Sequence, residues 1–451
     1  MEWGRPRPEL SGSVKTPFEV LMTRRQIGGG VRLVELRRRR QGTLRTPATR
    51  IGSDIQSRID AMQRRTESRQ VIMRKLLVIL PASTAYRAPF FDLVIPRLAT
   101  HGIQLTVAHG GAAASFRQRG DVVDRPWSVR VRTRTRDAAN QPWALRRWRE
   151  AEAKPDLVIV QQAIKNLETY PLIARQRLNG PSVAMWGHGK NYSTPQRRAA
   201  SLLKQWLVRR CDWFFAYTES GAAFIAEHGF PPDHISVLRN TIDTQGLQRQ
   251  LAAVTESEVS EFRGQNDLVP GRTALFLGGV DDNKGIEFLL LSAALVAEQL
   301  PGFKLLVAGE GASAAACRAA QTAGAPLRML GRVEGHAKAL ALSAADVLVV
   351  PQSIGLVAVD SLAAGVPIVS TSHPLHGPEA EYLEDRKTAV FVEHEASCYA
   401  EAIADLLIDT ERLEAMAQAC IRESDSYSLE NMAQAFIDGV LAWNALSKSQ
   451  S

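Results

Sequence analysis

The chain has 451 residues and a formal net charge of +8. A positive net charge is typical of proteins that bind a polyanion such as nucleic acid. The basic excess lies in one segment, because residues 1–72 hold 16 basic and 7 acidic residues whereas residues 73–451 hold 39 and 40. We therefore expect no nucleic-acid partner for the folded region, and the length is enough for two domains with extensions.

The four cysteines lack metal-ligand spacing, which is typical of free thiols in a reducing cytoplasm rather than of disulfides or a zinc site. They are Cys211, Cys317, Cys398 and Cys420. The most apolar run, 347–372, is interrupted by two prolines and an aspartate, so it predicts a buried core and not a membrane span. We also expect no signal peptide, because no apolar segment follows the first charges. The sequence thus indicates a cytoplasmic protein.

Residues 1–72 form a basic leader that we expect to be disordered, since Arg37–Arg40 lie in one run and no hydrophobic period is sustained. Met73 is followed at once by Arg74, Lys75 and an apolar strand, as at the start of many cytosolic α/β proteins. This pattern gives the hypothesis that translation begins at Met73. Under that hypothesis, a protein without the leader keeps its fold and activity.

Strand and helix patterns alternate over residues 73–240, which predicts a first Rossmann-like domain with a parallel sheet. Its first unit is predicted as a strand at 76–80, an amphipathic helix at 87–102 and a strand at 103–110. Further strands are predicted at 156–160, 182–189, 213–218 and 235–240.

The alternation restarts after residues 241–272, a polar segment that predicts a hinge with a helix. A second domain is predicted over 273–427, with strands at 274–279, 304–311, 327–333, 346–351 and 367–372. Residues 428–451 predict a final helix that packs back toward the first domain. The simplest assembly is an α/β protein with two Rossmann-like doubly wound domains facing across a cleft.

Residues 346–373 organise the second domain, because they contain a strand, a turn, a short helix and a second strand. In a parallel sheet the turn and the helix N-terminus lie at the carboxyl edge, where backbone N–H groups favour a phosphate. Gln352 lies in the turn and Asp360 lies about one helical turn beyond Gly355, so both could contact one ligand. The alternative is that Gln352 only caps the turn and that Asp360 is a solvated helix residue.

Two glycines, Gly278 and Gly279, end a buried strand shortly before Lys284. An ammonium group and free helix N–H groups could together neutralise a pyrophosphate there, and the alternative is a surface lysine on a loop. Gly309 and Gly311 imitate a dinucleotide fingerprint, but the acidic residue expected after the next strand is absent, which argues against an NAD site. The chain has neither a P-loop motif nor a GxSxG elbow.

These motifs occur in an order that resembles the family 4 (group 1) retaining glycosyltransferases of GT-B fold, and the resemblance covers most of 73–446. The residues that match the family pattern are, in order, Gly278 and Lys284, Gly309 and Gly311, Gly331, and then Pro351, Gly355, Asp360, Ala363, Gly365, Val366 and Pro367. The segment LRNTIDT at 238–244 is similar to the hinge sequence of that family, and WGHG at 186–189 resembles its segment with a histidine near the cleft.

The resemblance implies a role for individual residues. The implied catalytic residues are His188, Lys284 and Gln352, although His188 could instead be a structural histidine. The implied donor-binding residues are Gly278, Gly279, Lys284, Glu310, Arg332, Val333, Gln352, Gly355, Leu356, Val357 and Asp360. The expected acceptor-side residues are Tyr86 and Arg87, which could equally only anchor their loop.

The chain departs from the family pattern at several of these positions. Gln352 and Asp360 stand where the family has two glutamates, one touching the transferred sugar and one holding the ribose. Aspartate still accepts hydroxyl hydrogen bonds, whereas glutamine is neutral and both donates and accepts. Gly279 stands where the family often has an arginine, and Ile354 replaces a phenylalanine. Lys284 is then the single obvious cation for the diphosphate.

The resemblance implies transfer of a sugar from a nucleotide-diphosphate donor to a glycan or lipid-linked saccharide, with retention, without a metal or other cofactor, and in cell-surface polysaccharide synthesis. The basic amphipathic segment 196–213 could lie on anionic lipid at the inner face of the membrane, or could pack with a solvated face. The alternative function is a non-catalytic GT-B protein that binds a sugar nucleotide or a glycan. An epimerase would need further acid–base carboxylates.

Overall fold

The computed structural model describes residues 73–110, 123–136, 143–176, 178–190 and 198–449. The basic leader, its predicted disorder and the proposed start at Met73 concern residues 1–72, which lie outside the described residues. All four cysteines are free, as their spacing predicted. Within the described part of the chain, no helix has both the length and the apolar composition to cross a bilayer.

The first sheet is parallel throughout, as the alternating pattern predicted. Its strands are β1 (Arg74–Leu80), β2 (Ile103–His109), β3 (Ser128–Arg130), β6 (Leu157–Gln161), β7 (Ser182–Gly187), β8 (Trp213–Ala216) and β9 (Ile235–Val237), in the order β3-β2-β1-β6-β7-β8-β9. The connecting helices are α2 (Ala88–Thr100), α4 (Thr169–Gln176), α5 (Arg198–Val208) and α6 (Glu219–Glu227). The order reverses between β1 and β6, which is where ligands bind in such folds.

The second sheet repeats this topology. Its strands are β10 (Thr273–Leu277), β11 (Lys304–Ala308), β12 (Leu327–Gly331), β13 (Val347–Val349), β14 (Ile368–Thr371) and β15 (Ala389–Val392), in the order β12-β11-β10-β13-β14-β15. Its helices are α9 (Ile286–Gln299), α10 (Ala314–Thr322), α11 (Gly335–Ala344), α12 (Val357–Ala364), α13 (Ala396–Ile408) and α14 (Thr410–Ser424). The reversal lies between β10 and β13, the two strands whose following turns carry the predicted Lys284 and Gln352.

The segment 241–272 contains two helices where the sequence predicted one. These are α7 (Thr244–Ala253) and α8 (Glu256–Gln265). The chain leaves helical geometry at Val254 and starts again at Thr255, whose side chain accepts from the backbone of Glu258 in a capping box. Such a box satisfies two backbone donors at a new helix start, so it favours a second helix over one long one.

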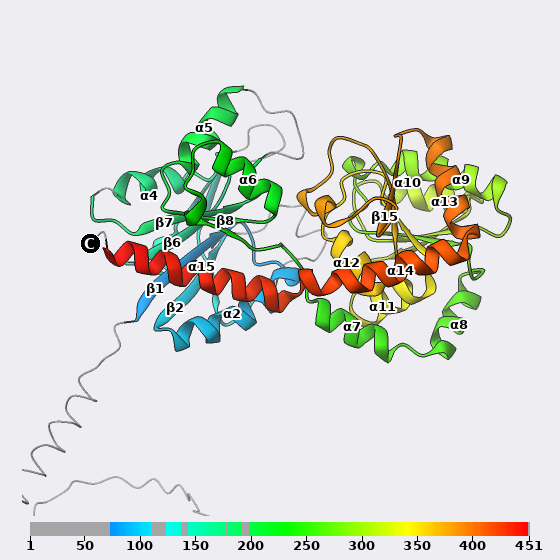
Figure 1. The fold of residues 1–451 in the computed structure, drawn as a ribbon, viewed down its shortest axis with the longest axis horizontal. Helices are drawn as coiled ribbons and strands as arrows, with labels where there is room; N and C mark the ends of the chain where they lie inside the picture. Colours follow the sequence, from blue (N-terminus) through cyan, green and yellow to red (C-terminus); the bar gives the residue numbers. More distant parts are fainter. Residues whose placement is uncertain (1–72, 111–122, 137–142, 177, 191–197, 450–451) are drawn as a thin grey trace, which may run out of the picture. The chain divides into compact units, whose positions relative to one another are not determined.

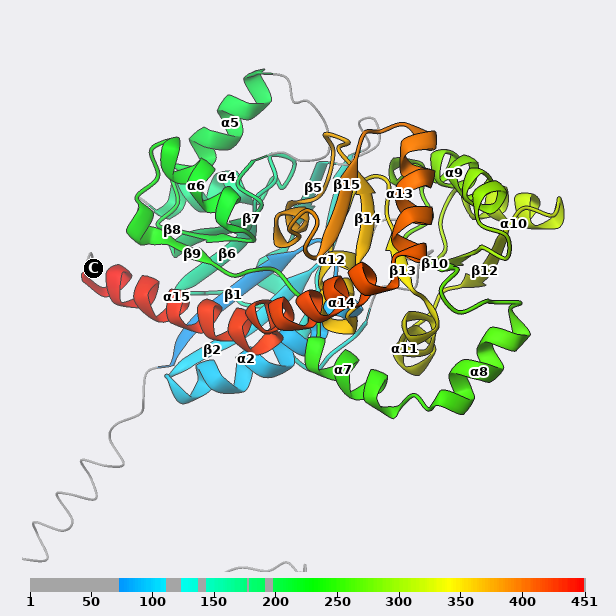
Figure 2. The ribbon, with the colours of Figure 1, turned by 45° about the vertical axis from the view of Figure 1, so that its right-hand side comes forward.

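The last helix, α15 (Leu429–Ser449), completes the core of the first sheet (Figures 1 and 2). Phe436 on α15 packs its ring against Phe90, Trp186 and Phe215, with centroid distances of 5.0–5.5 Å. Trp443, one of the largest fully buried side chains, donates its indole N–H to Ser182 Oγ at 2.8 Å. The core around the first sheet is therefore built from residues at both ends of the described chain.

This packing predicts that Trp443→Ala lowers the free energy of unfolding by about 3–5 kcal/mol, because it leaves a large cavity in the core of the first sheet. Trp206 on α5 is the matched control, since it is 45% exposed and touches Arg210 through its ring. Trp206→Ala should cost only about 1 kcal/mol. Urea denaturation of both variants measures the difference, and equal losses would contradict the role of α15 in the core.

Candidate functional site

Three turns at the carboxyl edge of the second sheet lie side by side. The backbone N–H of Gly278 donates to Ala308 O at 3.0 Å, and that of Gly309 donates to Gly331 O at 2.7 Å. A Cβ atom on Gly309 would stand 1.8 Å from Gly278 O, so only glycine fits this contact. The glycines that the sequence singled out therefore allow the turns after β10, β11 and β12 to approach one another closely.

A cavity of about 210 Å³ opens between these turns. Its walls are Leu277, Gly278, Gly279, Ala308, Gly309, Glu310, Arg332, Val333 and Glu334. Five predicted donor-binding residues thus line one cavity. Arg332 donates to Glu334, and Arg318 donates to Glu310 at 2.5 Å, so the charges at the rim are largely paired. The volume is below the roughly 300–1,000 Å³ of typical ligand pockets, so this cavity would hold only part of a nucleotide sugar.

Lys284 links the turn after β10 to the turn after β13. It ends a short 3-10 helix, η4 (Asp282–Lys284), and its ammonium group donates to Ser353 O. Gly285 then adopts φ +68° and α9 begins, so the N-terminus of α9 opens beside Lys284. Gln352 packs against this point, since a Cβ on Gly285 would lie 2.9 Å from Gln352 Cδ. Two of the three predicted catalytic residues are therefore neighbours.

The turn after β13 leads into α12. Leu356 is the N-cap of α12 and offers no side-chain cap. Among the described residues, none accepts a hydrogen bond from the backbone N–H groups of Gly355, Leu356 or Val357. The first turn of a helix leaves such donors open to an anion. The predicted phosphate donors thus lie on the same turn as Gln352.

Asp360 is buried, being 7% exposed, so the alternative of a solvated helix residue is wrong. Lys338 on α11 donates to its carboxylate at 2.5 Å. Burial raises the pKa of Asp360, and the charge of Lys338 acts in the opposite direction. Nothing in the sequence pointed to Lys338, because Lys338 on α11 and Asp360 on α12 come together only in the tertiary fold. A ribose hydroxyl at Asp360 would share the carboxylate with this ammonium group.

Arg87 and Tyr86 follow β1 in the short helix η1 (Ala85–Arg87). The guanidinium group of Arg87 donates to the hydroxyls of Tyr217 at 2.9 Å and Tyr86 at 3.1 Å, and it lies 4.6 Å from the ring centre of Trp186. Arg87 is only 9% exposed, whereas Tyr86 is 40% exposed. These contacts favour the loop-anchor interpretation for Arg87 and leave Tyr86 facing solvent.

His188 follows β7, and its ring packs on Tyr217 with a centroid distance of 4.5 Å. Burial, together with the charges of Lys204 and Arg87, lowers the pKa of His188 to about 4. Burial also lowers the pKa of Lys204, on α5, to about 8. His188 is therefore a neutral imidazole near pH 7, able to accept or donate one hydrogen bond but not to act as a cation.

Glu379 connects the two sides of the candidate site, and the sequence did not point to it. It lies in η5 (Pro378–Tyr382), is 5% exposed and accepts a hydrogen bond from Asn240 Nδ2 at 2.7 Å. Burial raises its pKa, while Asn240 and the positive charges of Arg87 and Lys284 act in the opposite direction. Arg87 and Lys284, predicted for different domains, thus both lie within electrostatic reach of one carboxylate.

The comparisons with known proteins agree with this arrangement. A family model described as Glycosyl transferases group 1 matches residues 271–409, and one described as Glycosyltransferase Family 4 matches residues 92–245. The two matches cover both sheets. The chain belongs to the group 1/family 4 glycosyltransferases. This result confirms the family that the glycine turns and Lys284 indicated.

Two similar sequences are glycosyltransferases of bacteria. The chain is 37% identical over 106 residues to the phosphatidyl-myo-inositol mannosyltransferase of Mycobacterium tuberculosis, covering 22% of this chain and 28% of the relative. It is 28% identical over 253 residues to the D-inositol 3-phosphate glycosyltransferase of Corynebacterium aurimucosum, covering 52% of this chain and 58% of the relative. The chain therefore matches only part of the length of these relatives.

Similar structures extend over most of the chain. HepE of Anabaena, solved in complex with UDP, has a TM-score of 0.59 at 15% identity and covers 82% of this chain and 100% of its own. Sucrose-phosphate synthase of Thermosynechococcus elongatus has a TM-score of 0.60 at 16% identity, covering 83% of this chain and 100% of its own. These likenesses confirm the GT-B fold that was predicted for this group 1/family 4 member.

A hairpin of this glycosyltransferase-family chain carries a second feature that the sequence reasoning missed. Strands β4 (Thr133–Arg136) and β5 (Trp143–Arg146) pair antiparallel, and Ala144 bonds to the backbone of Lys165 and Leu167 after β6. One face is buried, where Arg146 pairs with Glu168 at 2.5 Å. The other face exposes Arg132, Arg134, Arg136, Leu145 and Arg147. Arginine at every second residue from 130 to 136 is the signal that could have predicted it.

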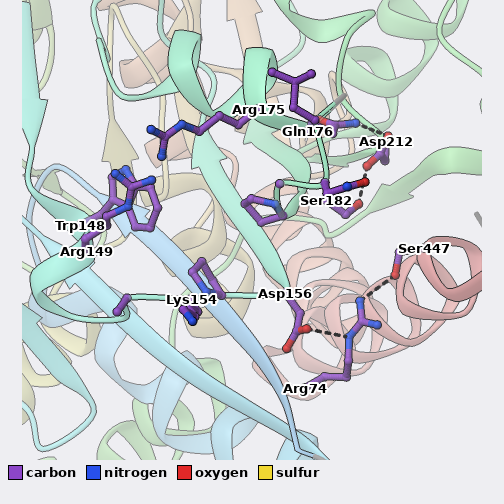
Figure 3. A pocket seen from close by; sticks show the side chains of 16 residues that line it. Arg74, Trp148, Arg149, Lys154, Asp156, Arg175, Gln176, Ser182, Asp212 and Ser447 are labelled. Atoms are coloured by element: carbon purple, nitrogen blue, oxygen red, sulfur yellow. Dashed lines mark hydrogen bonds and ion pairs between the residues drawn. The ribbon is translucent and has the colours of Figure 1, made fainter. Parts of the chain in front are cut away.

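A larger cavity, of about 1070 Å³, contains none of the predicted residues (Figure 3). It lies at the amino ends of β1, β6 and β7, where Arg74 contacts Asp156 and Ser447, and where Ser182 and Gln176 donate to Asp212. Ligands of open parallel sheets bind at the carboxyl ends of the strands. Size alone therefore does not identify the functional site in this family member.

The lowered pKa of His188 predicts a pH-dependent stability. The unfolded chain binds a proton at His188 below its ordinary pKa of 6.5, whereas the folded chain resists protonation until about pH 4. The contribution of His188 should therefore lower the free energy of unfolding by up to about 3 kcal/mol as the pH falls from 7 to 4. Urea denaturation of His188→Gln should show a shallower acid slope than the unaltered protein. His101→Gln, at an exposed histidine, is the control and should keep the full slope.

Proposed function

We propose that this protein transfers a sugar from a nucleotide-diphosphate sugar to a hydroxyl of an acceptor. The observation that carries the proposal is the meeting of Lys284, the N-terminus of α9 and the open N–H groups at the start of α12. These groups converge at the β10/β13 reversal of the second sheet, beside the cavity of the three glycine turns. HepE, which shares the fold, was solved with UDP, and this supports a nucleotide donor.

The chemistry follows from where charge develops. As the bond between the sugar and the diphosphate breaks, negative charge grows on the leaving phosphate oxygens, so donors fixed at that place lower the barrier. Lys284 is held there by Ser353 O, and the two helix N-termini add backbone donors. We propose that these groups replace a metal ion in this role, and that transfer proceeds with retention at the anomeric carbon.

The acceptor that we propose is a glycan or a lipid-linked saccharide, in the synthesis of a cell-surface polysaccharide. It would approach from the first sheet, where Tyr86 is exposed and neutral His188 can position a hydroxyl. The name of one relative includes phosphatidyl-myo-inositol and that of another includes D-inositol 3-phosphate, which supports an acceptor that carries a phosphate. The arginine face of the β4–β5 hairpin, at the carboxyl edge of the first sheet, has the charge to attract such a group.

The proposal predicts that Lys284→Ala lowers kcat by about a hundredfold or more, because one fixed charge at the leaving group is lost. Mass spectrometry of products from a panel of nucleotide sugars and glycan acceptors provides the assay. Lys448→Ala, at an exposed lysine near the end of α15, is the matched control and should keep full activity.

The same assay separates the enzyme from the alternative, a GT-B protein that only binds sugar nucleotides. Binding without transfer or donor hydrolysis across the whole panel would favour the binding protein. Turnover by the unaltered chain that survives in Lys284→Ala would instead overturn the role assigned to Lys284.

We also propose contact with the membrane through α5, at the cytoplasmic face. Leu202 is 65% exposed and Trp206 45% exposed, one helical turn apart, and Arg209 and Arg210 follow them. An apolar pair beside arginines suits the boundary of an anionic bilayer. Leu207 and Val208 are buried, so α5 packs on the domain by one face and presents the other to solvent.

Co-sedimentation with vesicles tests this contact, using lipid mixtures with and without an anionic phospholipid. Leu202→Ser/Trp206→Ser should weaken binding to anionic vesicles at least about tenfold, because two side chains no longer enter the bilayer. The comparison is Arg134→Ala/Arg136→Ala, which removes charge from the hairpin. Loss of binding in the hairpin variant alone would show that α5 is not the contact.

A further inference from the structure

The orientation of the Gln352 side chain can be deduced from its neighbours, and this deduction rests on the proposed function. We infer that Gln352 presents its amide oxygen, not its NH2 group, to the transferred sugar, and that His394 and Thr371 fix this orientation. His394 and Thr371 are then positioning residues for the donor. Neither was singled out by the sequence, because they follow and end other strands, β15 and β14.

Thr371 is the last residue of β14. Its hydroxyl oxygen lies 2.7 Å from Pro351 O and 2.9 Å from His394 Nδ1. A hydroxyl has one hydrogen atom, and a carbonyl oxygen can only accept. The hydrogen must therefore lie between Thr371 and Pro351, because two acceptor oxygens at this distance would otherwise repel. Thr371 then accepts from His394, so Nδ1 of His394 carries the proton.

The tautomer of His394 fixes the amide of Gln352. In a neutral imidazole with the proton on Nδ1, Nε2 is an acceptor. The side-chain nitrogen of Gln352 lies 3.1 Å from that Nε2 and donates to it. Among the described residues, His394 is the single hydrogen-bond partner of the Gln352 amide, so the amide oxygen remains for a ligand.

Packing holds the imidazole in place. The ring of His394 stacks on Phe288 of α9 with a centroid distance of 4.3 Å and an interplanar angle of 11°. Gln352 itself rests on Gly285, the residue before α9. A rotation of either side chain would therefore lose a ring stack or meet the backbone of the helix N-terminus.

A second histidine ties the same strand end to the turn. His376 accepts at Nδ1 from the backbone N–H of Ile354 at 3.2 Å and donates from Nε2 to Thr371 O at 2.8 Å. Thr371 is thus bonded to both imidazoles. This arrangement requires His376 to be neutral as well, because a proton on Nδ1 would face the N–H of Ile354.

The consequence is chemical. An amide oxygen accepts from a sugar hydroxyl as the carboxylate of a glutamate would, so Gln352 keeps the acceptor function of the family residue without its charge. The orientation would be lost if His394 were protonated, since Nε2 would then become a donor facing another donor. Burial and the nearby His373, whose ring centre is 4.9 Å away, lower the pKa of His394.

Other titratable groups around this cluster act in the same direction. His376, which also faces His373 and Lys284, has its pKa lowered by burial and by those charges. Within the described part of the chain, the other ring and hydrogen-bond contacts of His394 are with the uncharged Phe288, Thr371 and Gln352. The adjacent Glu393 and Glu395 are exposed. The neutral state of His394 is thus favoured near pH 7.

The first test is spectroscopic and needs no turnover. Nitrogen-15 NMR of the full chain, labelled at its nine histidines, reports which ring nitrogen carries the proton, and His394→Phe assigns the signal. We expect the Nδ1–H tautomer at His394 at pH 7. The Nε2–H tautomer there would overturn the inference, because Gln352 would then turn its oxygen toward His394.

The second test is kinetic. Thr371→Val removes the hydroxyl that selects the tautomer, and kcat/KM for the donor should fall about tenfold, the scale of one hydrogen bond. Thr371→Ser retains the hydroxyl and should recover most of that loss, together with the Nδ1–H signal.

A third comparison tests whether Thr371 acts by orienting the amide of Gln352 or only by stabilising the fold. In Gln352→Glu both oxygens accept, so no orientation is needed, and adding Thr371→Val should then lower kcat/KM less than about twofold. A tenfold loss in both backgrounds would show a purely structural role and overturn the inference. If no variant and no unaltered protein transfers sugar, the proposed function fails, whereas the tautomer experiment still decides the orientation.

Discussion

The hydrogen bond from Lys284 to Ser353 O is the contact on which the candidate site depends. It joins the turns after β10 and β13, the two strands between which the sheet order reverses. Parallel strands bring their carboxyl ends to one edge, but only a bond between the turns sets the distance between an ammonium group and the start of α12. The remaining parts of the site, from the glycine cavity to Gln352, are arranged around this link.

The fold was predictable from sequence because buried parallel strands are continuous apolar runs that turns and helices separate. The strand predicted at 346–351 is β13, and the helix that followed it is α12. Lys284 and Gln352 could be found for the same reason, since each lies directly after such a strand. The second helix at 256–265 was missed, because this polar segment has a capping box but no hydrophobic period that would predict a helix.

Lys338, Glu379 and His394 could not be predicted, because each acts through a partner far away in the sequence. Lys338 reaches Asp360 from another helix, and Glu379 reaches Asn240 across the hinge. Their residue types are common on protein surfaces, so type and local pattern carry no signal. Lys338 and Glu379 are notable because each contacts a buried polar group, and His394 is notable because it hydrogen-bonds to Gln352. Only the tertiary structure determines these contacts.

The place of α15 has a consequence for how the chain reaches its folded state during synthesis. Phe436 and Trp443 fill the core of the first sheet, yet they follow the whole second domain in the chain and leave the ribosome after it. Until then, the aromatic side chains of Phe90, Trp186 and Phe215 lack the helix that covers them. The first domain therefore keeps an exposed apolar surface while the second domain is synthesised. Chaperones would be needed most during this interval.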